Sequence, residues 1–218
     1  MNAKLSIFKN NPGNTPEFIA NALRNAILQG RYKANQPLRQ DQIAEELGVS
    51  KIPLREALVQ LKAEGLVTFM PQRGAVVSEL SASEAEEIYT MRTALESVAI
   101  EKAIPRLSIS DVIRAQSVLE IIDHENDKTQ WGDLNWEFHA TLYQAAQMPL
   151  LLNAIQNLHI NVARYLIIYL DHLSASDLSQ KEHWALLKAC REKKIANAKR
   201  ILGKHLKQAS ERLITYLS

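Results

Sequence analysis

Residues 43–58 read IAEELGVSKIPLREAL, and this stretch decides the fold of the first part of the chain. It predicts two short helices, about Gln40–Leu47 and Lys51–Glu64, joined by the tight turn Gly48-Val49-Ser50. Apolar residues recur at helical spacing in both. Pro53 falls in the first turn of the second helix, where a missing N–H has little cost. Two helices joined in this way are typical of a helix-turn-helix.

The flanking segments complete a small compact unit. Before the two helices, Pro16–Gln29 predicts a helix with Thr15 as its N-cap and Gly30 as its C-terminal stop. After them, Leu66–Phe69 and Ala75–Val77 predict a β-hairpin with a turn at residues 71–74. A hairpin directly behind the second helix is the wing of a winged helix-turn-helix.

Basic side chains point away from the buried stripe of the second helix. Lys51 and Arg55 lie one turn apart near its N-terminus, Ser50 offers a hydroxyl there, and Arg73 lies at the tip of the hairpin. Through Ser78 the chain has ten Lys/Arg and six Asp/Glu, whereas the remainder is slightly acidic. Each charge alone could be a solvated surface residue, but together they favour binding of double-stranded DNA.

Three stretches resemble the winged helix-turn-helix of the GntR family of bacterial transcription regulators: LRNAILQG (23–30), IAEELGVSKIPLREAL (43–58) and EGLV (64–67). The likeness covers residues 16–78. It implies a DNA-binding regulator, not an enzyme, and it places these residues at the family's DNA-contacting positions: Ser50, Lys51, Arg55, Arg73 and Gly74.

The chain departs from the family pattern at three places. Lys51 replaces the usual arginine, which puts bidentate reading of guanine there in doubt. Ala34-Asn35 replaces the usual Pro-Gly turn, and asparagine is the next-best residue for a positive φ. Asp41 occupies a position where some relatives contact DNA with arginine, and an acid cannot make that contact.

Residues 79–218 predict helices throughout, so the fold class is mainly α: an N-terminal winged helix-turn-helix followed by an antiparallel all-α bundle. Ser83 and Ser110 are the expected N-caps of the first two helices, and Pro105 ends the first. The later helices are expected at about Trp131–Ala146, Leu150–Leu173, Ser176–Arg191 and Lys194–Leu217.

All six histidines lie in this second part. Asn135 and His139 are one turn apart on one helix face, and His183 and His205 lie on the two following predicted helices. Facing helices of a bundle can bring such side chains around a metal ion. The alternative is that these histidines are surface or hydrogen-bonded core residues, the class to which we assign His124, His159 and His172.

The second part also resembles a known domain, the FCD (FadR-type C-terminal) effector domain, over residues 84–215. The resemblance rests on Ile88-x-x-x-Arg92-x-x-x-Glu96, Asn135-x-x-Phe138-His139, Ser179-x-x-Glu182-His183 and the late His205. In metal-bearing members an Asp and three His hold the ion. The resemblance therefore implies a divalent metal, zinc or nickel, at Asn135, His139, His183 and His205, with a neutral amide in place of the Asp.

Arg92 is the candidate residue for an effector carboxylate, because guanidinium binds carboxylates bidentately; its alternative is an ion pair with Glu96 at i+4. The resemblance implies a homodimer whose operator affinity is controlled by a small organic acid, most simply a repressor. Two rivals stay open at this point: a metal-free regulator that binds an acyl ligand, and a metal-dependent enzyme with a DNA-binding domain attached.

The expected organisation is therefore a flexible lead-in (1–14), a DNA-binding domain (15–78) and an effector-binding and dimerisation domain (79–218). The chain has a single cysteine, Cys190, so no internal disulfide is possible. It has no apolar run of membrane-spanning length. These features predict a cytoplasmic protein without a membrane partner.

Overall fold

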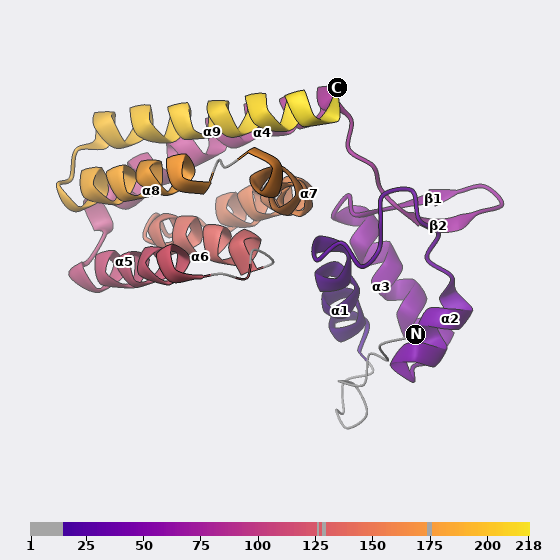
Figure 1. Ribbon diagram of the computed structural model, residues 1–218. Helices are drawn as coiled ribbons and strands as arrows, with labels where there is room; N and C mark the ends of the chain where they lie inside the picture. Colours follow the sequence, from indigo (N-terminus) through magenta and orange to yellow (C-terminus); the bar gives the residue numbers. More distant parts are fainter. Residues whose placement is uncertain (1–14, 126, 128–129, 174–175) are drawn as a thin grey trace. The chain divides into compact units, whose positions relative to one another are not determined.

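The computed structural model describes residues 15–218 apart from residues 126, 128, 129, 174 and 175, so the predicted lead-in lies outside the described residues. The chain divides into two compact units, residues 1–79 and 80–218. The first unit holds three helices and a hairpin, and the second is helical (Figure 1). The mainly α fold class predicted from the sequence is confirmed.

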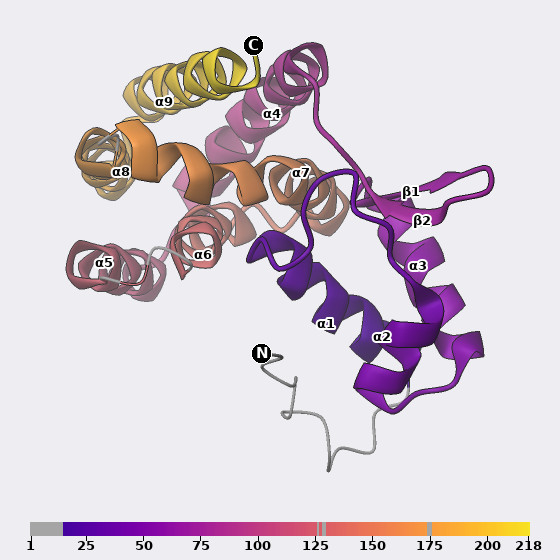
Figure 2. The same cartoon turned by 45° about the vertical axis from the view of Figure 1, so that its right-hand side comes forward.

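The first unit is a winged helix-turn-helix. Its elements in chain order are α1 (Pro16–Leu28), α2 (Gln40–Leu47), α3 (Lys51–Ala63), β1 (Val67–Met70) and β2 (Gly74–Val77). Helix α1 packs against α3, and the hairpin extends from the end of α3 (Figure 2). A continuous apolar core joins these elements; among its fully buried side chains are Ile19, Ile27, Leu54, Leu58, Leu61 and Leu66.

Backbone turns explain why this unit folds as the sequence predicts. Gly48 ends α2 in the left-handed region (φ 66°), and the Val49 N–H donates to the Ala44 carbonyl, which closes the turn before α3. Asn35 also has a positive φ (62°), as the sequence analysis predicted for the turn at Ala34-Asn35. The hairpin pairs Val67 with Val77 and Met70 with Gly74 in antiparallel register.

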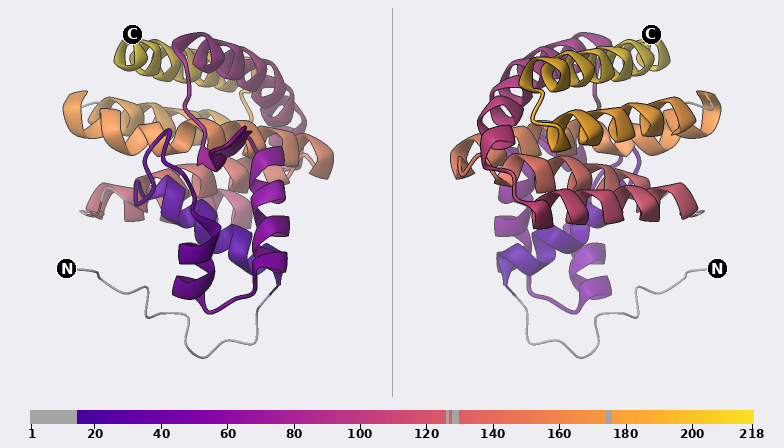
Figure 3. Two further views of the ribbon diagram at one scale, coloured as in Figure 1. Left: turned by 90° about the vertical axis from the view of Figure 1, so that its right-hand side faces the viewer. Right: turned by 90° about the vertical axis from the view of Figure 1, so that its left-hand side faces the viewer.

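The second unit is a bundle of long helices: α4 (Ala82–Ala103), the short 3₁₀ segment η2 (Ile104–Arg106), α5 (Ile109–His124), α6 (Trp131–Gln144), α7 (Pro149–Leu173), α8 (Ser176–Arg191) and α9 (Ile195–Leu217). Helix α4 lies along α9 and also packs on α6 and α7, while α8 packs between α9 and α5 (Figures 1 and 3). Four helices, α6 to α9, therefore surround one interior with α4.

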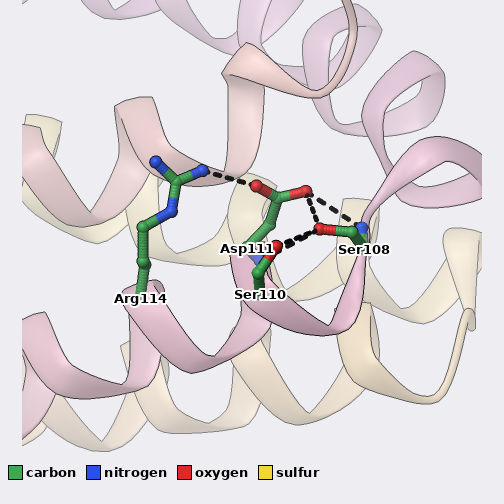
Figure 4. Close-up of polar contacts among 4 residues, drawn as sticks. All are labelled: Ser108, Ser110, Asp111 and Arg114. Atoms are coloured by element: carbon green, nitrogen blue, oxygen red, sulfur yellow. Dashed lines mark hydrogen bonds and ion pairs between the residues drawn. The ribbon is translucent and has the colours of Figure 1, made fainter.

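Two helices of the bundle begin two residues earlier than predicted. Ser81, not Ser83, is the N-cap of α4, and Ser108, not Ser110, is the N-cap of α5. Both form a capping box, in which the serine hydroxyl accepts from the backbone N–H three residues later and an acid returns the bond; Figure 4 shows this for Ser108 and Asp111. For α5 the acid at the third position selects Ser108, because Ile113 stands three residues after Ser110. For α4 both serines have a glutamate there, Glu84 or Glu86, and the structure uses Ser81.

Lys193 closes the corner between α4 and α5. Its Nζ donates to the carbonyls of Ile104 (2.6 Å) and Leu107 (2.7 Å), which follow the end of α4. Lys193→Met keeps most of the apolar stem but leaves these acceptors without the charged donor, so we expect a loss of about 2 kcal/mol of unfolding free energy. Urea denaturation checks this, with exposed Lys188→Met as the control that should change little.

Cys190 is completely buried in α8, and burial raises the pKa of its thiol to about 12. Since the thiolate is the reactive form, we expect Cys190 to resist Ellman's reagent at pH 8 in the folded protein, at least about a thousandfold slower than a free thiol. Guanidinium should restore one fast-reacting thiol per chain. Rapid labelling of the native protein would contradict the placement of this side chain.

Within the described part of the chain, none of the helices combines the length and apolar character that crossing a bilayer requires.

Candidate functional site

The predicted DNA-contacting residues lie together at the N-terminal end of α3. Lys51 and Arg55 are both exposed there. Lys51 Nζ pairs with Asp41 Oδ1 (2.5 Å), and Arg55 Nε donates to Gln40 Oε1 (3.1 Å). Ser50 holds the N-cap position without a capping hydrogen bond from its side chain, so its hydroxyl is available to another acceptor or donor. This end of α3 therefore offers two exposed cations and a hydroxyl to a phosphate backbone.

The wing holds the other two predicted DNA contacts. Arg73 is exposed in the hairpin turn, and its Nη2 donates to the Asn35 carbonyl (3.2 Å). Gly74 begins β2 with a positive φ (71°), a conformation that a residue with a side chain rarely adopts. The hydrogen bond to the Asn35 carbonyl orients the Arg73 side chain.

One residue of this surface, Ile52, was missed in the sequence analysis. Ile52 is 70% exposed beside Lys51, and an exposed aliphatic side chain at the start of a recognition helix suits a thymine methyl group. The sequence could have indicated it, because Ile52 is apolar but does not belong to the set of apolar residues that form the buried face of α3. Asp41, which cannot itself contact a phosphate favourably, pairs with Lys51 and so offsets its charge in the free protein.

The three predicted histidines come together in the interior of the bundle. His139 from α6, His183 from α8 and His205 from α9 each place one ring nitrogen within 4.8 Å of the other two, and all three residues are buried. Four-coordinate zinc with Zn–N bonds of ~2.0–2.1 Å separates ligand nitrogens by ~3.4 Å. Small side-chain rotations would therefore bring the three nitrogens to a metal.

An outer acceptor holds Nδ1 of each ring. The three contacts are Tyr143 Oη to His139 (3.3 Å), Gln180 Oε1 to His183 (3.2 Å) and Glu182 Oε2 to His205 (3.0 Å). The direction of each bond follows from the partner. Tyr143 already donates to Glu96 Oε2 (2.6 Å), Gln180 Nε2 already donates to the Leu119 carbonyl and Asp123, and the Glu182 carboxylate can only accept.

Consequently each imidazole carries its proton on Nδ1 and has its lone pair on Nε2. Metal-binding histidines in proteins are oriented by outer partners of this kind. Buried His139 Nε2 has no hydrogen-bond partner among the described residues, which is a costly arrangement unless something binds there.

Burial keeps the His139 and His183 rings neutral. Burial, followed by the neighbouring His183 and His205 rings, lowers the pKa of His139 well below its ordinary value. Burial and the His205 ring do the same to the pKa of His183. Neutral imidazoles at physiological pH present lone pairs without a proton to displace, which is the form that a metal requires.

Asn135 and Arg92 lie beside the cluster. Asn135 Nδ2 is 3.2 Å from His183 Nε2, and a half-turn of the amide would present its oxygen there instead. Arg92 is 5% exposed and its Nε donates to Glu96 Oε1 (2.7 Å), so the intrahelical ion pair kept as the alternative for this residue is formed. Glu96 in turn accepts from Tyr143, and this chain of bonds joins Arg92 to His139.

The three remaining histidines differ in how they compare with the sequence prediction. His124 is exposed, as expected of a surface residue, and the His172 side chain lies outside the described residues. His159 corrects the prediction: it is 3% exposed, and although the Gly132 backbone lies near its ring, neither ring nitrogen has a partner with hydrogen-bond geometry in the described part of the chain. It is thus neither a surface histidine nor a satisfied core histidine. Sequence could not show this, since the spacing of His159 on α7 resembles that of an ordinary packing residue.

Fold and sites together define a DNA-binding transcription regulator with a helical second domain. Residues 15–77 match the gntR family of bacterial regulatory proteins, and residues 87–208 match the FCD domain. The chain belongs to the GntR family, in the group that carries an FCD domain. These families consist of regulators, which removes the enzyme alternative.

Known proteins agree with this assignment. The HTH-type transcriptional repressor RspR of Escherichia coli is 26% identical over 87% of this chain and 84% of its own length. A solved GntR-family regulator from Pseudomonas syringae is 32% identical, with a TM-score of 0.58 over 97% of this chain and 91% of that one. E. coli McbR/YncC shares the fold with a TM-score of 0.82, at 24% identity over 93% and 98% of the two chains.

Proposed function

We propose that this regulator is a homodimeric repressor whose hold on its operator is controlled by a small organic acid bound at a divalent metal in the FCD domain. The observation that carries the proposal is the convergence of three buried imidazoles whose Nδ1 atoms each contact an outer hydrogen-bond acceptor. The similarity to a protein named a repressor supports repression, rather than activation, of transcription.

The donor set favours zinc or nickel. His139, His183 and His205 would supply three nitrogens, and Asn135 would supply an amide oxygen as a weaker fourth ligand. Borderline divalent ions prefer imidazole over the all-oxygen sites that magnesium and calcium occupy. When bound, the metal would act as a Lewis-acidic anchor for an oxygen ligand.

Charge balance points to an anionic effector. The three imidazoles and the amide are neutral ligands, so among the groups around the ion the Glu182 carboxylate behind His205 offsets only one of its two positive charges, and an aspartate in place of Asn135 would offset the other. Arg92 adds a buried cation near the cluster, although Glu96 compensates it. A carboxylate that completes the coordination sphere would restore neutrality in a site from which water is largely excluded.

A covalent path joins this site to the DNA-binding domain. Helix α4 begins at Ala82, five residues after the wing strand ends at Val77, and it carries Arg92 and Glu96 of the bonded chain that reaches His139. A ligand that moves His139 would therefore pull on α4. Because α4 follows directly from the wing, we propose that it couples effector binding to the placement of the two DNA-binding heads.

Metal content tests the proposal. Untagged protein is dialysed and its bound metals are measured by mass spectrometry, in parallel with a His139→Ala/His183→Ala variant and a His124→Ala control. We expect about one zinc or nickel per chain in the wild type and the control, and none in the double variant. No bound metal in any of the three, even after incubation with zinc, would overturn the metal-centred proposal.

A further inference from the structure

The metal explains only one of the unpaired polar atoms in the bundle interior. Besides His139 Nε2, both ring nitrogens of His159 and the indole Nε1 of Trp131 are buried without a hydrogen-bond partner among the described residues. Proteins rarely leave such groups unpaired, because desolvation is then not compensated. Three unpaired atoms in one region indicate a second place where something polar binds.

These atoms adjoin the histidine cluster. Trp131, Asn135 and His139 follow each other at four-residue intervals and so lie along one face of α6. His159 projects from α7, which packs against α6, and its ring lies 5.2 Å from that of Trp136. His159 also interacts electrostatically with Arg92 and His139. The unpaired groups therefore extend the proposed metal site toward the start of α6.

We infer that His159 and the Trp131 indole N–H form a second subsite, which binds a hydroxyl group of the effector while its carboxylate binds the metal. The effector class is then a hydroxylated carboxylic acid, rather than a plain fatty acid or a dicarboxylate. This inference rests on the proposed function, because it takes the metal as the anchor of the carboxylate.

The chemistry of His159 favours a hydroxyl. Burial, and then the charge of Arg92, lower the pKa of His159 to about 3 against the opposing effect of the nearby Gly132 backbone, so the ring is neutral. A neutral imidazole has one donor and one acceptor, and a hydroxyl group can satisfy both. A second carboxylate accepts only; it would leave the imidazole acceptor unpaired and would bring a second negative charge into the bundle. The indole N–H adds one more donor for the hydroxyl oxygen.

The first test needs no ligand. His159→Phe keeps an aromatic ring against Trp136 and removes both unpaired nitrogens. We expect the melting temperature of metal-free protein to rise by about 3 °C, because an unsatisfied polar group has been removed from the interior. Exposed His124→Phe is the matched control, expected to change little. A lower melting temperature for His159→Phe would show that the ring makes stabilising polar bonds in the free protein, and would overturn the inference.

The second test measures binding of three six-carbon acids by calorimetry on zinc-loaded protein: D-gluconate, hexanoate and adipate. We expect the wild type to bind D-gluconate roughly tenfold tighter than hexanoate or adipate. His159→Phe and Trp131→Phe should lose that preference while keeping their affinity for hexanoate. Equal binding of the three acids, no binding, or a preference for adipate would overturn the inference, as would an unchanged preference in His159→Phe.

The zinc content of each variant separates the two proposals. If the wild type holds no zinc, the proposed function fails. If zinc is retained in every variant but the preference for D-gluconate is absent, only the second subsite fails. His159→Phe and Trp131→Phe leave His139, His183 and His205 intact, so we expect full zinc occupancy in both.

Discussion

Arg55→Ala is expected to lower operator affinity by roughly ten- to a hundredfold. Arg55 is exposed on the N-terminal half of α3, where a recognition helix reaches base edges, and in the free protein its Nε donates to Gln40 Oε1 at 3.1 Å. Loss of one good base contact costs about 1–3 kcal/mol and relaxes specificity at that position. Fluorescence anisotropy measures the effect, with a DNA fragment selected from random sequence by the wild-type protein.

The matched control is Lys62→Ala. Lys62 lies on the same helix, is also exposed, and sits near the Phe69 ring at the far end of α3. The Lys62→Ala substitution removes one positive charge, as Arg55→Ala does, so it measures how much DNA affinity depends on the net charge of the domain alone. If Arg55→Ala and Lys62→Ala weaken binding equally, the N-terminal half of α3 is not the reading element.

The first domain could be predicted in detail because its signals are local. Gly48 and Asn35 both adopt the positive φ that their residue types allow, and Thr15 accepts from the Phe18 N–H as a predicted N-cap should.

In the second domain the starts of α4 and α5 were predicted two residues late, because each start has two serines that could serve as the N-cap. Asp111 decides for Ser108 at α5, whereas at α4 both serines are followed three residues later by a glutamate, so this sequence signal does not distinguish them.

The site was less predictable, and the reason differs from residue to residue. The outer partners Tyr143 and Gln180 lie on the same helix as the ring they hold, four residues after His139 and three before His183, so helical spacing could have found them. Glu182 holds His205 across two helices, and only the packing of α8 on α9 shows this. The ring nitrogens of His159 are unpaired because the surrounding described residues place no hydrogen-bonding group in suitable geometry, and a sequence pattern cannot predict this.

Zinc is expected to stabilise the wild-type protein strongly. A ligand present at about a thousand times its Kd adds about 4 kcal/mol to the unfolding free energy when the unfolded chain does not bind it. For a chain of this size that corresponds to a rise of ~10 °C in melting temperature. We expect His183→Ala to abolish the rise, since it removes one of three converging nitrogens, and His124→Ala to keep it. Differential scanning calorimetry with chelator and with added zinc gives the comparison.

The zinc affinity of a Glu182→Gln variant tests whether the three buried histidines bind a metal or only pack against one another. The carboxylate contacts His205 Nδ1 at 3.0 Å and does not belong to the three converging nitrogens. A glutamine oxygen can still accept that bond but lacks the negative charge that strengthens the imidazole as a ligand, so zinc affinity should fall about 10- to 100-fold. The zinc-induced rise in melting temperature should then need correspondingly more zinc and remain attainable. If His183→Ala responds to zinc as the wild type does, the ion binds elsewhere, and the three imidazoles must be satisfied by a ligand that needs no metal.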